Sequence, residues 1–216
     1  MGRGSSLSGA NGGGGGSPTN VTSATDIWSY RHNQGNAPFV DAINGGLMTI
    51  DNDFPGFANG INTVDAVTMS GKDGSQTLGY WAPGTKQLGM NQNFTDVDKM
   101  NAVMDNAAKS GFHPSRGNKT GTEAVAIHEG GHALTDYLAQ KTGARSLDEV
   151  SANVVKAAYK KSGMRGGNKK FAGTISRYAQ QNYAECVAEA VADWYCNGNN
   201  ASNASKLIMA ELKSYA

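Results

Sequence analysis

Two histidines stand four residues apart in the segment 128–132, which reads HEGGH. On an α-helix, residues four apart lie on the same face about one turn from each other, so both imidazoles can point at a single ion. Glu129 lies beside the pair. The pattern His-Glu-x-x-His is typical of zinc sites in which the glutamate is the general base. The sequence therefore predicts His128 and His132 as metal ligands and Glu129 as the catalytic base.

A second segment, residues 178–189, reads YAQQNYAECVAE and carries two glutamates. Residues 183–196 are predicted to form a helix, because apolar residues recur there at helical spacing and Asn182 is a suitable N-cap. Glu185 and Glu189 then share one face of this helix. A catalytic zinc site needs a third protein ligand and keeps one position for water. We therefore predict Glu185 as the third ligand, with Glu189 as the alternative.

The same residues have a simpler interpretation, in which the histidines lie on a helix flank and the glutamates are ordinary solvated acids. For a chain of this composition, chance would produce the histidine motif roughly 0.002 times. The pairing of that motif with a second acidic helix favours a metal site. A third possibility is an interaction module that binds no metal. Tightly bound zinc would exclude it.

Together the two segments resemble the catalytic domain of anthrax lethal factor and the related bacterial Pro-Pro endopeptidases, which are gluzincin metallopeptidases. The matching order is His-Glu-x-x-His, then a tyrosine seven residues before a glutamate, then a further glutamate four residues on. The metzincin extension is absent, because Thr135 and Leu138 stand where that subclass needs glycine and histidine. The resemblance spans roughly residues 80–195, about half of the chain.

This resemblance implies a function and a role for each matching residue. It implies a zinc-dependent endopeptidase that hydrolyses internal peptide bonds of a protein or peptide substrate through zinc-activated water. Tyr178 would donate its phenolic hydrogen to the oxyanion, and Glu189 would accept the free ring N–H of a ligand histidine. The implied fold class is α+β. It is a zincin-like domain, mainly helical with a small β-sheet, in which an active-site helix is joined by a second ligand-bearing helix.

The active-site helix has a start signal and a buried face in the sequence. Thr120 and Glu123 form a Ser/Thr-x-x-Glu capping box. Apolar or small residues follow at helical spacing and predict a buried stripe made of Ala124, Ile127, Gly131, Leu134 and Leu138. Gly130 and Gly131 each cost roughly 1 kcal/mol relative to alanine inside a helix. We therefore expect another segment or a ligand to approach the backbone there.

Other stretches predict the elements around that helix. Residues 76–81 and 87–90 flank a Pro-Gly-containing turn and predict a β-hairpin, whose edge we expect to hold substrate backbone. Two further Ser/Thr-x-x-acid patterns predict helix starts at Thr95–Asp98 and Ser146–Glu149. Between residues 36 and 55, paired glycines and a proline predict only short helical pieces.

The N-terminus differs in composition from the rest of the chain. Its first 18 residues are rich in glycine and serine, so we predict a flexible tail over residues 1–24 and one metallopeptidase domain over residues 25–216. The start of the tail also resembles that of some phage head-associated proteins. This favours an alternative function, a phage or prophage head-associated structural component that retains a zincin fold without turnover.

Charge and hydropathy exclude several classes of partner. The formal net charge is +1 and no basic block dominates, so nucleic-acid binding is not expected. No run approaches 18 apolar residues, so no membrane span is expected either. The first 30 residues lack the apolar segment of a signal peptide. We therefore expect a cytoplasmic protein, with a phage particle or export by a non-classical route as alternatives; the oligomeric state is left open.

The two cysteines and the two histidines outside the motif have positions that predict their roles. Cys186 and Cys196 are ten residues apart on or just beyond one predicted helix, about 15 Å, which is too far for a disulfide. We expect both to be free, buried thiols. His32 and His113 are ungrouped in the sequence. Of these two, His113 is expected to approach the cleft, because it precedes the active-site helix.

Overall fold

The computed structural model describes residues 37–67, 69 and 77–216, and it has the predicted α+β class. The predicted tail, the start of the predicted domain at residue 25 and His32 lie outside the described residues. The helices are α1 (Ala37–Asp53), α2 (Val97–Lys109), α3 (Gly121–Thr142), α4 (Leu147–Ser162), α5 (Gly167–Ala172), α6 (Tyr183–Asn197) and α7 (Asn203–Lys213). Short 3-10 turns are η3 (Phe57–Gly60), η4 (Gln92–Phe94), η5 (Tyr178–Gln180) and η6 (Gly198–Asn200).

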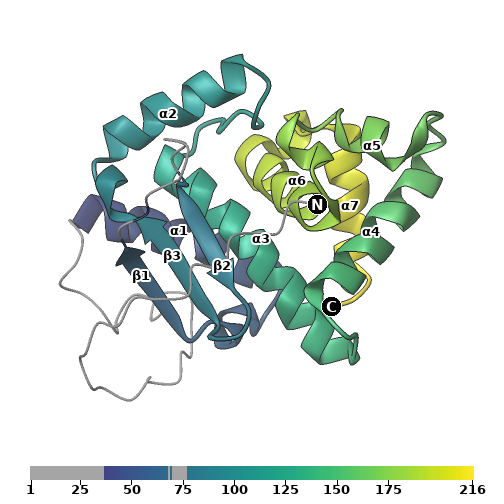
Figure 1. The fold of residues 1–216 in the computed structure, drawn as a ribbon, viewed down its shortest axis with the longest axis horizontal. Helices are drawn as coiled ribbons and strands as arrows, with labels where there is room; N and C mark the ends of the chain where they lie inside the picture. The colour runs from purple at the N-terminus through teal and green to yellow at the C-terminus, as the bar shows by residue number, and fades with distance from the viewer. Residues whose placement is uncertain (1–36, 68, 70–76) are drawn as a thin grey trace.

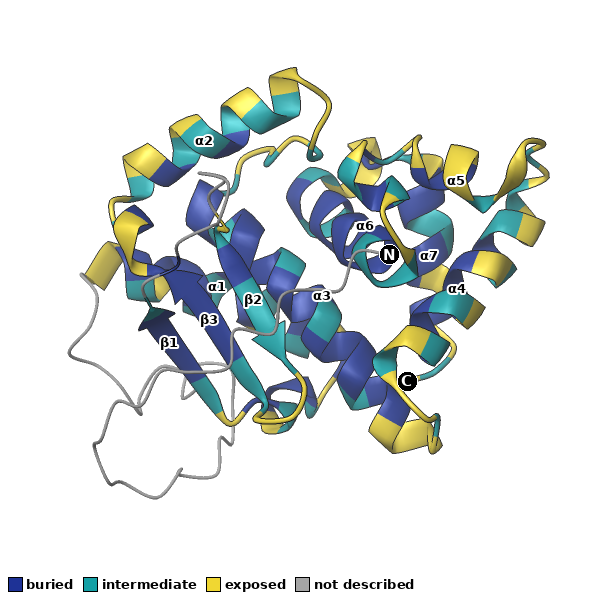
Figure 2. Cartoon of the chain, in the orientation of Figure 1, coloured by how far each residue is buried: buried dark blue, intermediate teal, exposed yellow. Residues whose placement is uncertain are grey.

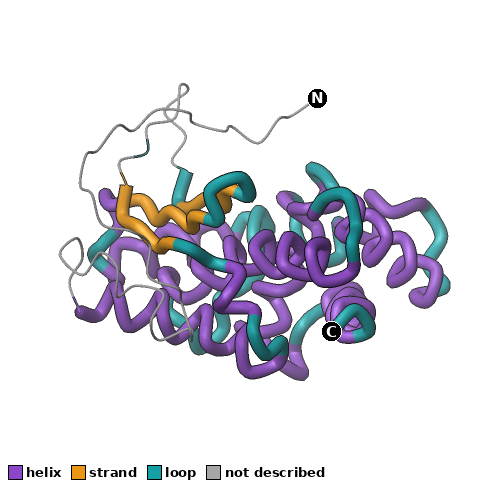
Figure 3. The backbone as a smooth tube through the Cα atoms, turned by 90° about the horizontal axis from the view of Figure 1, so that it is seen from below, coloured by secondary structure: helices purple, strands orange, loops and turns teal. Residues whose placement is uncertain are grey.

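A three-stranded sheet lies on one side of the helices (Figure 3). Its strands are β1 (Thr63–Val67), β2 (Gly79–Ala82) and β3 (Gln87–Asn91), in the order β1-β3-β2. β1 pairs with β3 in parallel, and β2 pairs with β3 antiparallel, with Gly79 opposite Met90. The predicted hairpin is therefore confirmed. β2 is an edge strand, and it lies beside α3 (Figure 1).

Helix α3 runs through the centre of the molecule and contacts α1, α2, α4 and α6. Its predicted capping box is confirmed, because Thr120 accepts from the Glu123 N–H and Glu123 accepts from the Thr120 N–H. Most of the helix is buried (Figure 2). The predicted stripe is buried in full, at Ala124, Ile127, Gly131, Leu134 and Leu138.

The paired glycines of α3 sit where two other helices come close. A Cβ at Gly130 would lie 2.5 Å from Cδ1 of Ile50 in α1. A Cβ at Gly131 would lie 2.8 Å from Cα of Ala188 in α6. Real Cβ atoms do not approach other atoms so closely. Glycine is therefore required at Gly131, which meets backbone, whereas at Gly130 the end of the Ile50 side chain would have to shift. The expected close approach is confirmed, and it involves α1 on one side and α6 on the other.

The prediction of short helical pieces near the N-terminus is wrong, because residues 37–53 form the continuous helix α1. The glycines do not break it. A Cβ at Gly46 would lie 3.0 Å from the backbone oxygen of Glu123, so the absent side chain lets α1 pack closely on α3. The burial of Phe39, Leu47 and other apolar residues against that helix outweighs the low helix propensity of glycine.

Two predicted helix caps differ in detail. The N-cap of α2 is Asp96 rather than Thr95, and its carboxylate accepts from the backbone N–H of Asp98 at 2.9 Å. Ser146 caps α4 as predicted, but the Glu149 carboxylate accepts from the N–H of Arg145, so the reciprocal bond of a capping box is replaced. Thr95 and Asp96 are adjacent and both residue types are good N-caps, so the sequence pattern does not separate them.

Candidate metal site

The structure brings together His128 and His132 of α3 and Glu185 of α6. One possible ligand atom from each lies within 4.8 Å of the others. Glu185 Oε2 is 3.2 Å from His128 Nε2 and 3.4 Å from His132 Nε2. These are the three side chains predicted as metal ligands, drawn from two helices that pack directly on each other.

Local structure explains how Glu185 reaches the histidines. Asn182 caps α6 by accepting from the Glu185 backbone N–H at 2.8 Å, as predicted, so the glutamate lies in the first turn. The close contact between Gly131 and Ala188 then brings this turn of α6 against α3. Gly131 directly precedes His132, and Ala188 lies three residues after Glu185. The separation of the two helices at this contact therefore sets the size of the site.

The electrostatics of the site favour a bound cation. Burial raises the pKa of the Glu185 carboxyl, but His128 and His132 outweigh burial and hold that pKa well below its usual range. Burial lowers the pKa of His128, yet Glu185 and Glu189 raise it well above its usual value. Glu185 Oε2 is also buried with no hydrogen-bond partner. A buried carboxylate oxygen within ion-pair distance of two ring nitrogens, but without an aligned hydrogen bond, fits a metal ion.

The chemistry of the donors indicates which ion this would be. Two imidazole nitrogens with one carboxylate form a set that zinc accepts in catalytic sites, with a fourth position left for water or substrate. His128, His132 and Glu185 supply that set. The residues present therefore fit a zinc ion, although other divalent transition metals also accept such ligands.

Glu189 lies on the opposite side of His128 from Glu185. Its Oε1 is 2.8 Å from His128 Nδ1 and 2.9 Å from Nδ1 of His113. Although Nδ1 of His128 is this close to Oε1 of Glu189, the two atoms are not aligned as a hydrogen bond. Its Oε2 accepts the Ser176 hydroxyl at 2.6 Å. A proton held on Nδ1 by Glu189 leaves His128 Nε2 free to bind a metal.

Glu189 is charged although it is buried, with 1% of its surface exposed. Burial raises the pKa of its carboxyl, but His113 and His128 outweigh this effect and lower the pKa to about 2. The expectation that His113 approaches the cleft is confirmed by its contact with this carboxylate. His113 was ungrouped in the sequence, so only its position before α3 gave a signal.

Glu129 follows His128 on α3 and is buried against the edge strand. A Cβ at Gly79 of β2 would lie 2.8 Å from Glu129 Cγ and 3.0 Å from its Oε1. Burial raises the pKa of the Glu129 carboxyl, and the charges of His128 and His132 partly offset that rise. A carboxylate with a raised pKa, placed next to a metal site, is suited to accept and return a proton.

Tyr178 lies in η5 and faces the metal group. Its ring centroid is 6.0 Å from that of His128 and 5.0 Å from that of His113. Burial raises the pKa of its hydroxyl, as do the nearby carboxylates and a hydrogen bond with Glu185. The phenol therefore stays protonated and remains a hydrogen-bond donor throughout the neutral range. The ring of Phe112 packs beside it, with the two ring centroids 5.2 Å apart.

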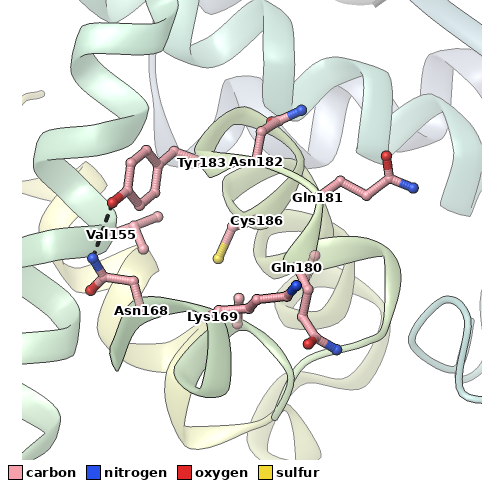
Figure 4. Close-up of a pocket in the computed structure, with 10 residues that line it drawn as sticks. Val155, Asn168, Lys169, Gln180, Gln181, Asn182, Tyr183 and Cys186 are labelled. Carbon is pink, nitrogen blue, oxygen red and sulfur yellow. Dashed lines mark hydrogen bonds between the residues drawn. The ribbon is translucent and has the colours of Figure 1, made fainter. Parts of the chain in front are cut away.

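A pocket of about 330 Å³ lies beside residues 179–183, the segment between Tyr178 and Glu185 (Figure 4). Its floor is apolar and includes Val155 of α4 and the Cys186 sulfur of α6, while amide side chains surround it. Cys186 and Cys196 are both free and buried, and burial raises the pKa of each thiol to about 12. The Cys186 sulfur points into this pocket (Figure 4), and Cys186 does not belong to the group of possible metal ligands.

Sequence reasoning missed two residues that touch the predicted site. Ser176 donates to Glu189 and accepts from the N–H of Ala179, so it holds the acid and the turn that carries Tyr178. Gly79 gives Glu129 the space it occupies. Neither residue belongs to a motif. In the sequence, nothing near Ser176 indicates a contact with Glu189. A single glycine in a predicted strand, such as Gly79, indicates only that another group approaches the backbone.

Comparison of the chain with protein-family models, with curated proteins and with solved structures gave no match. No helix within the described ranges is both long and apolar enough to cross a membrane.

Proposed function

We propose that this chain is a zinc-dependent endopeptidase with a zincin-like fold of the gluzincin type. The observation that carries the proposal is the position of Glu185 Oε2, 3.2 Å and 3.4 Å from the Nε2 atoms of His128 and His132. Glu129 lies next to this group and is buried. A base, a three-ligand set and a phenol donor side by side are the parts that metal-assisted peptide hydrolysis needs.

Each side chain would have a distinct task. A bound zinc ion would lower the pKa of the attacking water and polarise the substrate carbonyl. Glu129 would accept a proton from that water and pass it to the leaving amine. Tyr178 would donate its hydroxyl hydrogen to the oxyanion that develops on the substrate. Glu189 would hold a proton on His128 Nδ1 and thereby fix the tautomer.

The substrate would bind along the edge strand β2. Within the described residues this strand pairs with β3 on one side only, and its residue Gly79 touches Glu129. An extended peptide added to β2 by backbone hydrogen bonds would therefore pass the proposed base. Such binding uses main-chain groups of an internal segment, which favours endopeptidase activity on a protein or peptide substrate.

Cleavage of a random decapeptide library by the zinc-loaded protein tests this function. Wild type should cleave peptides at internal bonds, as measured by mass spectrometry of the products. Glu129→Gln should retain zinc but lose cleavage, because the amide cannot accept the proton. Substantial residual cleavage by this variant would contradict the role of Glu129. Bound zinc without any cleavage by wild type would instead favour the head-associated structural alternative.

A further inference from the structure

Asp136 lies on α3 one turn after His132, and its carboxylate joins that helix to the β2–β3 hairpin. Its side chain is 10% exposed. Oδ2 accepts from the Lys86 ammonium at 2.6 Å and from the Trp81 indole N–H at 3.1 Å. Oδ1 accepts from Gln140 on the same helix at 3.4 Å. A single buried oxygen of the active-site helix therefore binds two donors of the hairpin.

These two donors come from both sides of the hairpin turn. Trp81 belongs to β2, and Lys86 directly precedes β3. Lys86 has a φ of 55°, and within the described ranges no other non-glycine residue has a positive φ. Its carbonyl accepts from the N–H of Asn62 and of Thr63, the first residue of β1. A left-handed backbone is unfavourable for lysine, so the contact with Asp136 and these bonds hold it in place.

The other end of β2 touches α3 at the proposed base. Gly79 lies against Glu129 so closely that a Cβ there would be 2.8 Å from its Cγ. β2 is therefore fixed to α3 near both ends, by a steric contact at Glu129 and by charge-assisted hydrogen bonds at Asp136. Of these two contacts, only the one at Asp136 is attractive and directional. It therefore sets how β2 lies along the active-site helix.

We propose that Asp136 is a positioning residue that holds the edge of β2 in place for the substrate backbone. The part of this inference that concerns substrate rests on the proposed function. A buried ion pair adds little net stability compared with apolar packing, so its value here lies in fixing one orientation of the hairpin. Loss of the pair should loosen β2 locally while the metal ligands on α3 and α6 remain in place.

Hydrogen exchange of backbone amides tests the positioning without any assumption about activity. Asp136→Asn keeps an acceptor for Trp81 but removes the ion pair with Lys86. Exchange of the β2 amides should become about tenfold faster, which corresponds to the loss of one charge-assisted hydrogen bond. Exchange in α6 should not change. The matched control is Asp105→Asn. It breaks the ion pair between Asp105 of α2 and Arg116, and it should leave β2 unaffected.

Peptide affinity tests the consequence for substrate. In a Glu129→Gln background a peptide that wild type cleaves should bind without turnover, and adding Asp136→Asn should raise its Kd about tenfold at unchanged zinc content. Lys86→Arg with Asp136 intact keeps the ion pair, so this variant should retain most of the affinity and the slow exchange. Unchanged β2 exchange in Asp136→Asn would overturn the positioning role. Absence of cleavable peptides would overturn the proposed function, and the exchange measurement would still decide the role of Asp136.

Discussion

Glu185 and Glu189 lie one turn apart on α6 but contact different nitrogens of the same imidazole. Glu185 is nearest to His128 Nε2, and Glu189 is nearest to Nδ1. A histidine binds a metal through one nitrogen and is oriented through the other, so the two acids have different tasks. Glu185 also lies close to His132, which Glu189 does not contact. This geometry favours Glu185 as the ligand of the two glutamates.

The two glutamates should therefore differ in their effect on zinc affinity. Glu185→Ala removes a proposed ligand. Glu189→Gln removes the charge that orients His128, and it should lower the zinc affinity about 10-fold to 100-fold. Competition with a chromophoric chelator measures both values. We expect the loss in Glu185→Ala to be clearly larger. The reverse order would exchange the roles of the two acids.

At this scale the sequence predicted side chains that belong to motifs and missed those that act through tertiary contacts. The spacing of His128 and His132 follows from helix geometry alone, and Asn182 made the start of the second helix recognisable. Ser176 reaches Glu189 only because the chain turns between α5 and α6. In the sequence, Asp136 has the pattern of an ordinary surface acid on a helix. Its contact with Trp81 of the hairpin is visible only in the structure.

At the scale of elements, the site depends on the close approach of α3 and α6. Gly131 meets Ala188 at a distance that leaves no room for a Cβ, since the nearest backbone atom would be 2.8 Å away. His132 follows Gly131 on α3, and Glu185 lies three residues before Ala188 on α6. The packing of small residues thus brings the three proposed ligands of the two helices within 4.8 Å of one another.

Gly131→Ala should push these helices apart. The added methyl group would overpack the contact, so we expect the free energy of unfolding to fall by about 1–3 kcal/mol. Zinc affinity should fall as well, because Glu185 moves away from the histidines. Denaturant titration and chelator competition measure the two effects. Gly84→Ala is the matched control, since a Cβ there has nothing within 4 Å; equal effects of the two changes would contradict this account.

At the scale of the whole molecule, the family resemblance implied the α+β class, and local sequence signals predicted the hairpin and the start of the active-site helix. They failed where long-range packing outweighs local propensity. α1 is continuous through paired glycines because Gly46 allows α1 to pack against Glu123 and the rest of α3. The order of the three strands and the pairing of β1 with β3 also depend on contacts between distant residues. Such contacts leave no periodic pattern in one sequence.

The proposed function depends on one divalent ion bound between α3 and α6. Equilibrium dialysis against zinc, followed by elemental analysis, tests this claim most directly. Wild type should retain one zinc ion per chain, and the His128→Ala/His132→Ala double variant should retain none, because two of the three ligands are gone. Far-ultraviolet circular dichroism of both proteins would show that the variant is folded. Wild type without bound zinc, or a double variant that binds as much zinc as wild type, would contradict the account.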